Sequence, residues 1–241
     1  MALPTARGRV GRQVSPGELP SQRDLPGAHR VHLAAREPIG DRGLPEPLRL
    51  MPGRIVGLEG SVGFGMTRLG LNLLATYPAV GPIVYLDARG WMSPLAAWES
   101  GIDPDALVVV RCDDPVSWGR VAATLVEGVA AVYAEIPRGV KDTQLRTLAA
   151  LARRRSIPMV FRPIRSLLPP GLAHLRLTAR SVEWGGTDAG HGRLTQRTLV
   201  IEASGKAMRG IPALIELEDH GTDAVRLVSG LAAPAARRAA G

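Results

Sequence analysis

The sequence predicts an α/β fold with a mostly parallel central sheet, flanking helices, and antiparallel strands that extend one edge. Between residues 54 and 162, short apolar runs alternate with segments of helical periodicity. Some of these runs, such as 83–86 and 107–110, are apolar at every position, as in strands buried on both faces of a parallel sheet. After residue 165 the helical segments stop, and strand-like segments follow one another through glycine-rich connections.

The alternating part of the chain begins with a strand and ends with one. We predict strands at 54–60, 82–87, 106–112, 130–136 and 158–162, and helices at 67–77, 94–100, 115–128 and 141–155. Pro78 ends the first helix, and the third places Trp118, Ala122 and Leu125 on one face. Because strands alternate with helices, crossover connections make the strands parallel and place helices on both faces.

The rest of the chain divides into a strand-rich extension and two terminal segments. Strands at 174–184, 197–203, 213–218 and 224–228 are expected to be mostly antiparallel and to extend the sheet. Residues 1–45 are rich in proline, glycine and arginine without periodicity, which predicts a largely disordered segment. We therefore expect one core domain at 46–230, followed by a flexible tail at 231–241.

Composition limits the classes of function. The 241 residues carry a net charge of +8, and Lys141 and Lys206 are the only lysines, so the positive charge is almost all arginine. A basic balance favours nucleic-acid or acidic protein partners, although a GC-rich genome would also enrich arginine. Cys112 is the only cysteine, which excludes a disulfide within the chain. No uncharged apolar run reaches the about 18 residues of a spanning helix, so we expect a cytoplasmic protein without a membrane partner.

A phosphate-binding loop without its cation follows the first strand. Residues 60–67 read Gly-Ser-Val-Gly-Phe-Gly-Met-Thr, where the working motif is Gly-x4-Gly-Lys-[Ser/Thr] between a strand and a helix. Gly60, Gly65 and Thr67 fit this motif, Gly63 adds a further glycine, and Met66 takes the place of the lysine. A thioether carries no charge and cannot hold the outer phosphates. The pattern predicts a degenerate nucleotide-binding loop.

Residues 48–228 resemble the RecA-type recombinase core, because matching segments follow one another in the same order. These segments are Pro52-Gly53-Arg54-Ile55-Val56, Tyr85-Leu86-Asp87-Ala88, Gly101-Ile102-Asp103-Pro104-Asp105-Ala106-Leu107 and Val160-Phe161-Arg162-Pro163-Ile164-Arg165. The short core, the degenerate loop and the segments 175–184 and 197–202 are most similar to the ImuA-type proteins of bacterial mutagenesis operons, in particular the actinobacterial ImuA′ branch. SulA-type cell-division inhibitors share a related reduced core and remain an alternative.

The resemblance also implies where catalytic groups should stand, and this chain departs from the pattern. Arg89 follows Asp87-Ala88 at the position of the catalytic carboxylate, and a guanidinium cannot act as a general base. Ala134 stands at the Walker B position, with Glu135 one residue late, either as a magnesium contact or as a surface or capping glutamate. Pro163 follows the fifth strand, where a polar phosphate sensor is expected. These departures predict a protein that does not hydrolyse ATP and holds no cofactor or metal.

The expected function is therefore that of a non-catalytic RecA-like accessory protein in DNA damage tolerance. The resemblance implies partners in error-prone translesion synthesis: an ImuB-like relative of the Y-family polymerases, RecA, and a DnaE-type polymerase, with the protein near the nucleoid when active. DNA contacts could involve Arg138, Lys141, Arg162 and Arg165. The alternatives are an active DNA-dependent ATPase, which Met66 disfavours, and a SulA-like inhibitor of cell division.

Overall fold

The computed structural model describes residues 48–231 except for 79, 189–190 and 220–225. The predicted disordered segment at 1–45 and the tail beyond residue 231 lie outside the described residues. No helix in the described part of the chain is long and apolar enough to cross a membrane.

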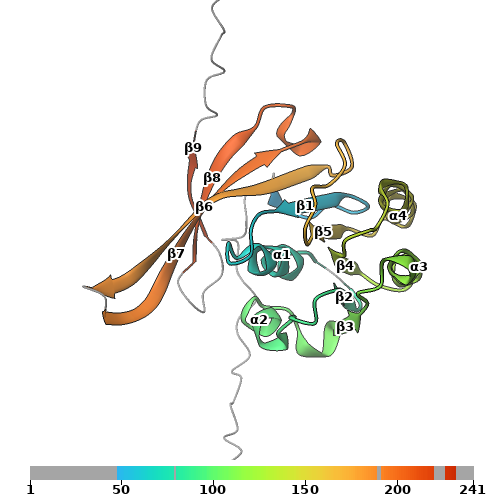
Figure 1. Cartoon of the computed structure of the whole chain (residues 1–241), viewed down its shortest axis with the longest axis horizontal. Coiled ribbons are helices and arrows are strands. Elements are labelled where there is room, and N and C mark those ends of the chain that lie inside the picture. Colours follow the sequence, from blue (N-terminus) through green and yellow to red (C-terminus); the bar gives the residue numbers. More distant parts are fainter. Residues whose placement is uncertain (1–47, 79, 189–190, 220–225, 232–241) are drawn as a thin grey trace, which may run out of the picture. The chain divides into compact units, whose positions relative to one another are not determined.

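The first half of the described chain alternates strands and helices, as predicted (Figure 1). The strands are β1 (Ile55–Glu59), β2 (Ile83–Asp87), β3 (Leu107–Arg111), β4 (Ala131–Ile136) and β5 (Met159–Pro163). The helices are α1 (Met66–Ala75), α2 (Pro94–Glu99), α3 (Pro115–Leu125) and α4 (Asp142–Arg155), with a 3-10 turn η2 (Pro104–Ala106) before β3. All neighbouring pairs among β1–β5 are parallel, which confirms the predicted parallel core.

The second half adds strands to the β1 edge. These are β6 (Leu175–Asp188), β7 (His191–Ser204), β8 (Ala213–Asp219) and β9 (Arg226–Leu231), with a 3-10 turn η3 (Lys206–Met208) after β7. The sheet order is β3-β2-β4-β5-β1-β6-β7-β8-β9. Strand β6 is parallel to β1, and the pairs from β6 to β9 are antiparallel. The predicted antiparallel extension is thereby confirmed.

The hairpin of β6 and β7 is longer than the sequence predicted. Both strands have 14 residues, whereas the apolar pattern predicted strands only at 174–184 and 197–203. Pairing continues from Trp184 and Arg197 to Asp188 and His191 across an irregularity in register. The extra pairs involve mainly polar residues and glycine, which give no apolar signal in the sequence.

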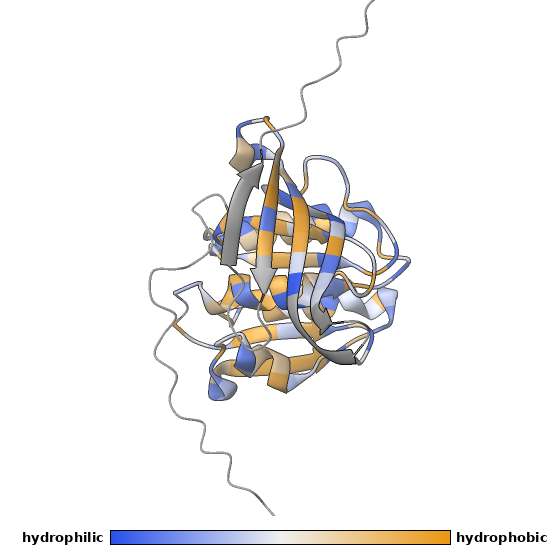
Figure 2. Ribbon diagram, turned by 90° about the vertical axis from the view of Figure 1, so that its left-hand side faces the viewer, coloured by the Kyte–Doolittle hydropathy of each residue, from blue (hydrophilic) through white to orange (hydrophobic). Residues whose placement is uncertain are grey.

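Helices cover the two faces of the parallel strands and form separate apolar cores. One core joins α1 and α2 to one face, and the other joins α3 and α4 to the opposite face. Along β4 the side chains alternate between them, since Tyr133 belongs to the first core and Ala134 to the second. Figure 2 shows apolar residues concentrated along the strands and the helices behind them. The alternation along a strand therefore shows on which face of the sheet each of its side chains lies.

Helix α1 lies within the larger core. Leu69, Leu71, Leu73 and Leu74 are all at most 1 % exposed, although they point in different directions around the helix. The same core includes Leu199 of β7 and Leu217 of β8, so the antiparallel strands also bury α1. Figure 1 shows α1 between the parallel strands and the β6–β7 hairpin.

Candidate functional site

The loop between β1 and α1 is rich in glycine and leads directly into the helix. Gly60, Gly63 and Gly65 have φ values of 152°, 90° and 71°, which side-chain-bearing residues rarely adopt. The Leu69 amide donates to the Gly65 carbonyl at 3.0 Å, which places Gly65 directly before the first helical turn. The predicted strand–loop–helix unit is therefore present.

Met66 faces the interior of the protein. Its side chain is 1 % exposed and belongs to the core around α1. A Cβ added at Gly60 would lie 3.4 Å from Cγ of Met66, so the methionine packs beneath the start of the loop. The position that holds a lysine in the working motif is thus part of the apolar core.

Thr67 and Arg162 both influence the buried phenol of Tyr133. Burial raises the pKa of Tyr133, whereas the charge of Arg162 and the proximity of Thr67 lower it. A Cβ added at Gly70 would lie only 2.3 Å from the Tyr133 ring, so this ring packs directly against α1. Thr67, the one motif residue with a hydroxyl, therefore lies beside a protonated tyrosine.

Arg197 of β7 approaches the loop from the antiparallel part of the sheet. A Cβ added at Gly65 would lie 1.8 Å from Nη1 of Arg197, so only glycine leaves room for this guanidinium. Arg197 is 8 % exposed, and its Cζ lies 5.7 Å from the centre of the Trp184 ring. The sequence suggested no role for this arginine, because the contact joins segments far apart in the chain.

Glu135 and Arg89 form a buried ion pair at the ends of β4 and β2. Nε of Arg89 donates to Oε1 of Glu135 at 3.0 Å, and Nη2 of Arg89 makes a second, shorter contact with the same oxygen. The Glu135 side chain is 1 % exposed, so it is neither a surface residue nor a helix cap. Burial opposes the charge on Arg89, but the hydrogen bond and charge of Glu135 raise the pKa of Arg89 overall.

Further donors surround the Glu135 carboxylate. The Tyr85 hydroxyl donates to Oε1 at 2.9 Å, and the Ala88 and Arg89 amides donate to Oε2 at 3.2 and 3.3 Å. Burial, Tyr133 and Glu135 raise the pKa of Tyr85, so its hydroxyl stays protonated and remains a donor. Its ring stacks on that of Tyr133, with centroids 4.4 Å apart.

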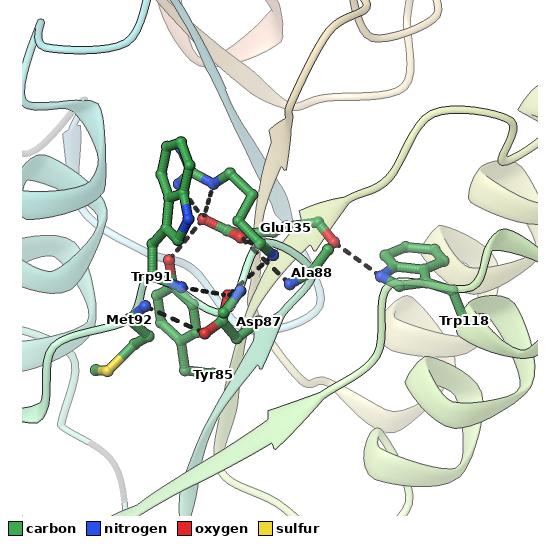
Figure 3. Close-up of polar contacts among 9 residues, drawn as sticks. Tyr85, Asp87, Ala88, Trp91, Met92, Trp118 and Glu135 are labelled. Carbon is green, nitrogen blue, oxygen red and sulfur yellow. Dashed lines mark hydrogen bonds and ion pairs between the residues drawn. The ribbon is translucent and has the colours of Figure 1, made fainter. Parts of the chain in front are cut away.

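Asp87 organises the turn that carries Arg89. Its Oδ1 accepts from the amides of Arg89 at 3.1 Å and Gly90 at 2.7 Å, and its Oδ2 accepts from Met92 at 3.1 Å (Figure 3). The turn leaves Trp91 67 % exposed, with Cζ of Arg89 5.1 Å from its ring centre. The Asp-Ala-Arg sequence therefore builds a fixed turn around an ion pair.

Ala134 and Glu135 point to opposite faces of β4. Ala134 is fully buried in the α3–α4 core, whereas the Glu135 carboxylate reaches the end of β2 on the other face. Trp118 of α3 donates from Nε1 to the Glu135 carbonyl at 2.8 Å, opposite the carboxylate in Figure 3. Glu135, and not Ala134, therefore has its side chain on the face of the loop.

The residues predicted to contact DNA separate into buried and exposed members. Arg162 is 5 % exposed, and its Nη1 has no hydrogen-bond partner among the described residues, so it does not present its charge at the surface. Pro163 is buried at the end of β5. Arg138, Lys141 and Arg165 are exposed, and the Lys141 amide donates to Oε1 of Gln144 at 2.9 Å at the start of α4.

A second buried glutamate at the end of β1 went unnoticed in the sequence. Glu59 is 5 % exposed, accepts a hydrogen bond from the Leu168 amide at 2.9 Å, and forms an ion pair with Arg176 of β6. Nη2 of Arg176 also donates to the carbonyls of Leu168 and Pro169, both at 3.1 Å. Glutamate directly before the first loop glycine was the available signal, since a charge inside an apolar strand needs a partner.

No group of three or more metal-ligating side chains is present among the described residues. The two glutamates nearest the loop, Glu59 and Glu135, are each paired with an arginine.

Fold and site together define a RecA-like α/β protein with a glycine-rich loop before α1, Met66 at the first position of that helix, and Arg89 paired with Glu135. Residues 44–162 match the family described as the MT3502 N-terminal domain. The chain is also 27 % identical over 170 residues to Protein RecA of Mycoplasma pneumoniae, an alignment that covers 66 % of this chain. That alignment covers 48 % of the relative, so the chain spans about half the length of the curated protein it matches.

Among solved structures, the RadB recombinase is similar at 18 % identity with a TM-score of 0.49. That match covers 75 % of this chain and 93 % of the recombinase.

Proposed function

We propose that the protein is a non-catalytic RecA-like accessory protein in DNA damage tolerance, which supports error-prone translesion synthesis through contacts with other proteins. The observation that carries this proposal is the ion pair between Arg89 and Glu135. It occupies the place where a RecA-type ATPase needs a carboxylate free to act on water. The protein would then use the fold as a surface for binding.

The chemistry of phosphoryl transfer supports the absence of hydrolysis. Such enzymes depend on positioned charges around the phosphates and a magnesium ion. Here Met66 is buried in the core, and Glu135 already accepts from Arg89, Tyr85 and two amides. A metal ion at Glu135 would have to displace a guanidinium from a buried carboxylate, which is costly.

The proposed partners follow from the resemblance to ImuA-type proteins. We propose direct binding to an ImuB-like relative of the Y-family polymerases, within a complex that includes a DnaE-type polymerase. RecA is a further candidate partner, since the chain is similar in sequence to a RecA protein over 170 residues. Arg138, Lys141 and Arg165 are exposed and would add salt-dependent contacts to DNA.

ATP binding and hydrolysis by the purified full chain, with and without single-stranded DNA, test the non-catalytic part. We expect no turnover above a blank in the natural protein. The variant Met66→Lys/Arg89→Glu restores two of the missing charges and serves as the comparison. DNA-stimulated turnover by the natural protein would overturn the proposal.

Binding to partners requires a separate measurement. Co-purification of the tagged full chain with an ImuB-like protein from the same genome should give a complex whose amount does not change on adding ATP. Overexpression provides the contrast with a SulA-like inhibitor, which would block division and produce filamentous cells. Filamentation without a complex would favour the SulA-like alternative.

A further inference from the structure

A cluster of cations lies at the amino-terminal end of β1, on the edge of the sheet opposite the glycine-rich loop. Arg54 directly precedes β1, and the loop follows Glu59 at the other end of this strand. A five-residue strand spans roughly 16 Å, so the two places are well separated. The cluster is therefore a different surface from the site described above.

Backbone hydrogen bonds bring distant segments of the chain together around Arg54. The His174 amide donates to the Ile55 carbonyl at 2.8 Å, which places His174 beside the start of β1. The His174 carbonyl accepts from the Ala207 amide at 3.0 Å, which holds η3 and its Lys206 at the same place. Burial lowers the pKa of His174, and the charges of Arg54 and Lys206 lower it further, so both cations lie close to this imidazole.

Two further arginines extend the cluster. Arg209 follows the η3 turn with a φ of 51°, a left-handed conformation that favours glycine or asparagine, so the backbone gives no reason for an arginine there. Arg153, in the last turn of α4, lies beside Gly53, where an added Cβ would be 3.1 Å from its Cα. All the cations of this basic cluster are exposed, and no salt bridge joins any of them to another described residue: Arg54, Arg153, Lys206 and Arg209.

We propose that the basic cluster binds the phosphate backbone of double-stranded DNA. Exposed cations without carboxylate partners attract a polyanion, and the closely spaced phosphates of a duplex can contact several of them at once. Single strands are usually held by stacking of their bases on aromatic side chains. The exposed tryptophans of the described chain lie elsewhere, in the turn after β2, in α2 and late in β6: Trp91, Trp98 and Trp184. The cluster therefore offers charge without a surface for stacking.

This surface differs from the DNA contacts that belong to the proposed function. Arg138 and Lys141 follow β4, and Arg165 follows β5, at the carboxyl-terminal ends of the parallel strands. The basic cluster lies at the opposite ends. The inference goes beyond the proposed function and does not depend on it, because DNA binding is measured without any protein partner.

The test is the binding of a fluorescein-labelled DNA duplex of mixed sequence to the full chain, measured by fluorescence anisotropy over a range of salt concentrations. The logarithm of the association constant falls with the logarithm of the salt concentration, with a slope of about −0.9 for each phosphate contact. Arg54→Gln/Lys206→Gln/Arg209→Gln should make this slope shallower by about two to three and weaken binding at low salt at least about tenfold. Lys206→Gln alone should make it shallower by about one.

Arg120→Gln is the matched control, since Arg120 is an exposed arginine of α3, a helix that contributes no residue to the cluster. It should leave the slope and the affinity unchanged. Circular dichroism and melting temperature show whether each variant is folded. A single strand of the same length should bind the natural protein more weakly than the duplex at equal salt.

The inference is overturned if the natural protein does not bind the duplex, or if the folded triple variant keeps the natural slope. Tighter binding of the single strand also overturns it. Polyglutamate that displaces the labelled duplex as effectively as unlabelled duplex does would assign the cluster to an acidic protein instead, and would overturn the inference as well.

Discussion

Arg89 and Glu135, 46 residues apart in the sequence, share a buried ion pair that joins the turn after β2 to the end of β4. The arginine neutralises the buried Glu135 carboxylate. Without a cation at position 89, the buried Glu135 charge would lack its strongest partner. The two residues therefore form one structural unit.

Removal of Arg89 should destabilise the protein. Arg89→Met leaves the Glu135 carboxylate buried without a cation, and we expect the free energy of unfolding to fall by about 3 kcal/mol. Arg89→Met/Glu135→Gln should recover much of this loss, because it removes both charges. Urea denaturation measures the differences. Arg155→Met is the control, since its pair with Glu127 is exposed and should contribute less than about 0.5 kcal/mol. A loss below about 1 kcal/mol for Arg89→Met would contradict this account.

Alanine should have opposite effects at two helical glycines. Glycine costs about 1 kcal/mol relative to alanine within a helix, so substitution usually stabilises. At Gly70 the new Cβ would lie 2.3 Å from the Tyr133 ring and 2.8 Å from Leu58, and we expect a loss of about 1–3 kcal/mol from overpacking.

At Gly119 the nearest atom is the flexible end of Gln144 at 3.1 Å, so Gly119→Ala should be neutral or stabilising by up to about 1 kcal/mol. Melting temperatures in one buffer give the comparison. Equal changes in melting temperature for Gly70→Ala and Gly119→Ala would show that the Tyr133 ring can move to make room for the new methyl group.

Trp118 should contribute to the stability of the fold, although it packs on the face of β4 opposite the loop. Trp118→Phe removes the donor to the Glu135 carbonyl inside the core, which leaves a buried acceptor and a smaller side chain. We expect a loss of about 2 kcal/mol in urea unfolding. Trp98→Phe is the control, because Trp98 is 36 % exposed and should change stability by less than about 0.5 kcal/mol.

His174 should make the fold sensitive to acid. Burial, with the nearby charges of Arg54 and Lys206, lowers the pKa of His174 below its ordinary value of 6.5. The unfolded chain therefore binds a proton more readily than the folded chain does. Stability from this group is present above about pH 6.5 and is lost as the pH falls below it.

The change in melting temperature between about pH 7.5 and about pH 5.5 should be smaller in His174→Gln than in the natural protein. An identical acid shift in both proteins would assign the effect to other groups.

The sequence predicted the fold well because its signals were local. Continuous apolar runs such as that of β2 and the loop glycines mark their elements without reference to the rest of the chain. The outer half of the β6–β7 hairpin was missed because its pairing depends on the opposite strand rather than on apolar content.

The site was predicted only in part. Residues that depart from a motif can be read from the sequence, but the distant residues that pair with them cannot. Met66 and Arg89 were visible as departures from a motif. Partners such as Glu135 for Arg89 and Arg176 for Glu59 lie 46 and 117 residues away, so only the folded chain brings them together. The approach of Arg197 to Gly65 likewise has no sequence signature.

Because apolar side chains surround α1 in several directions, its backbone should open to solvent only when the whole domain unfolds. Amide protons of Leu71 and Leu73 should then be among the slowest to exchange with deuterium. Helix α1 would thus be among the last parts of the domain to open. Destabilising substitutions in α1 would therefore act in a cell chiefly by lowering the amount of folded protein.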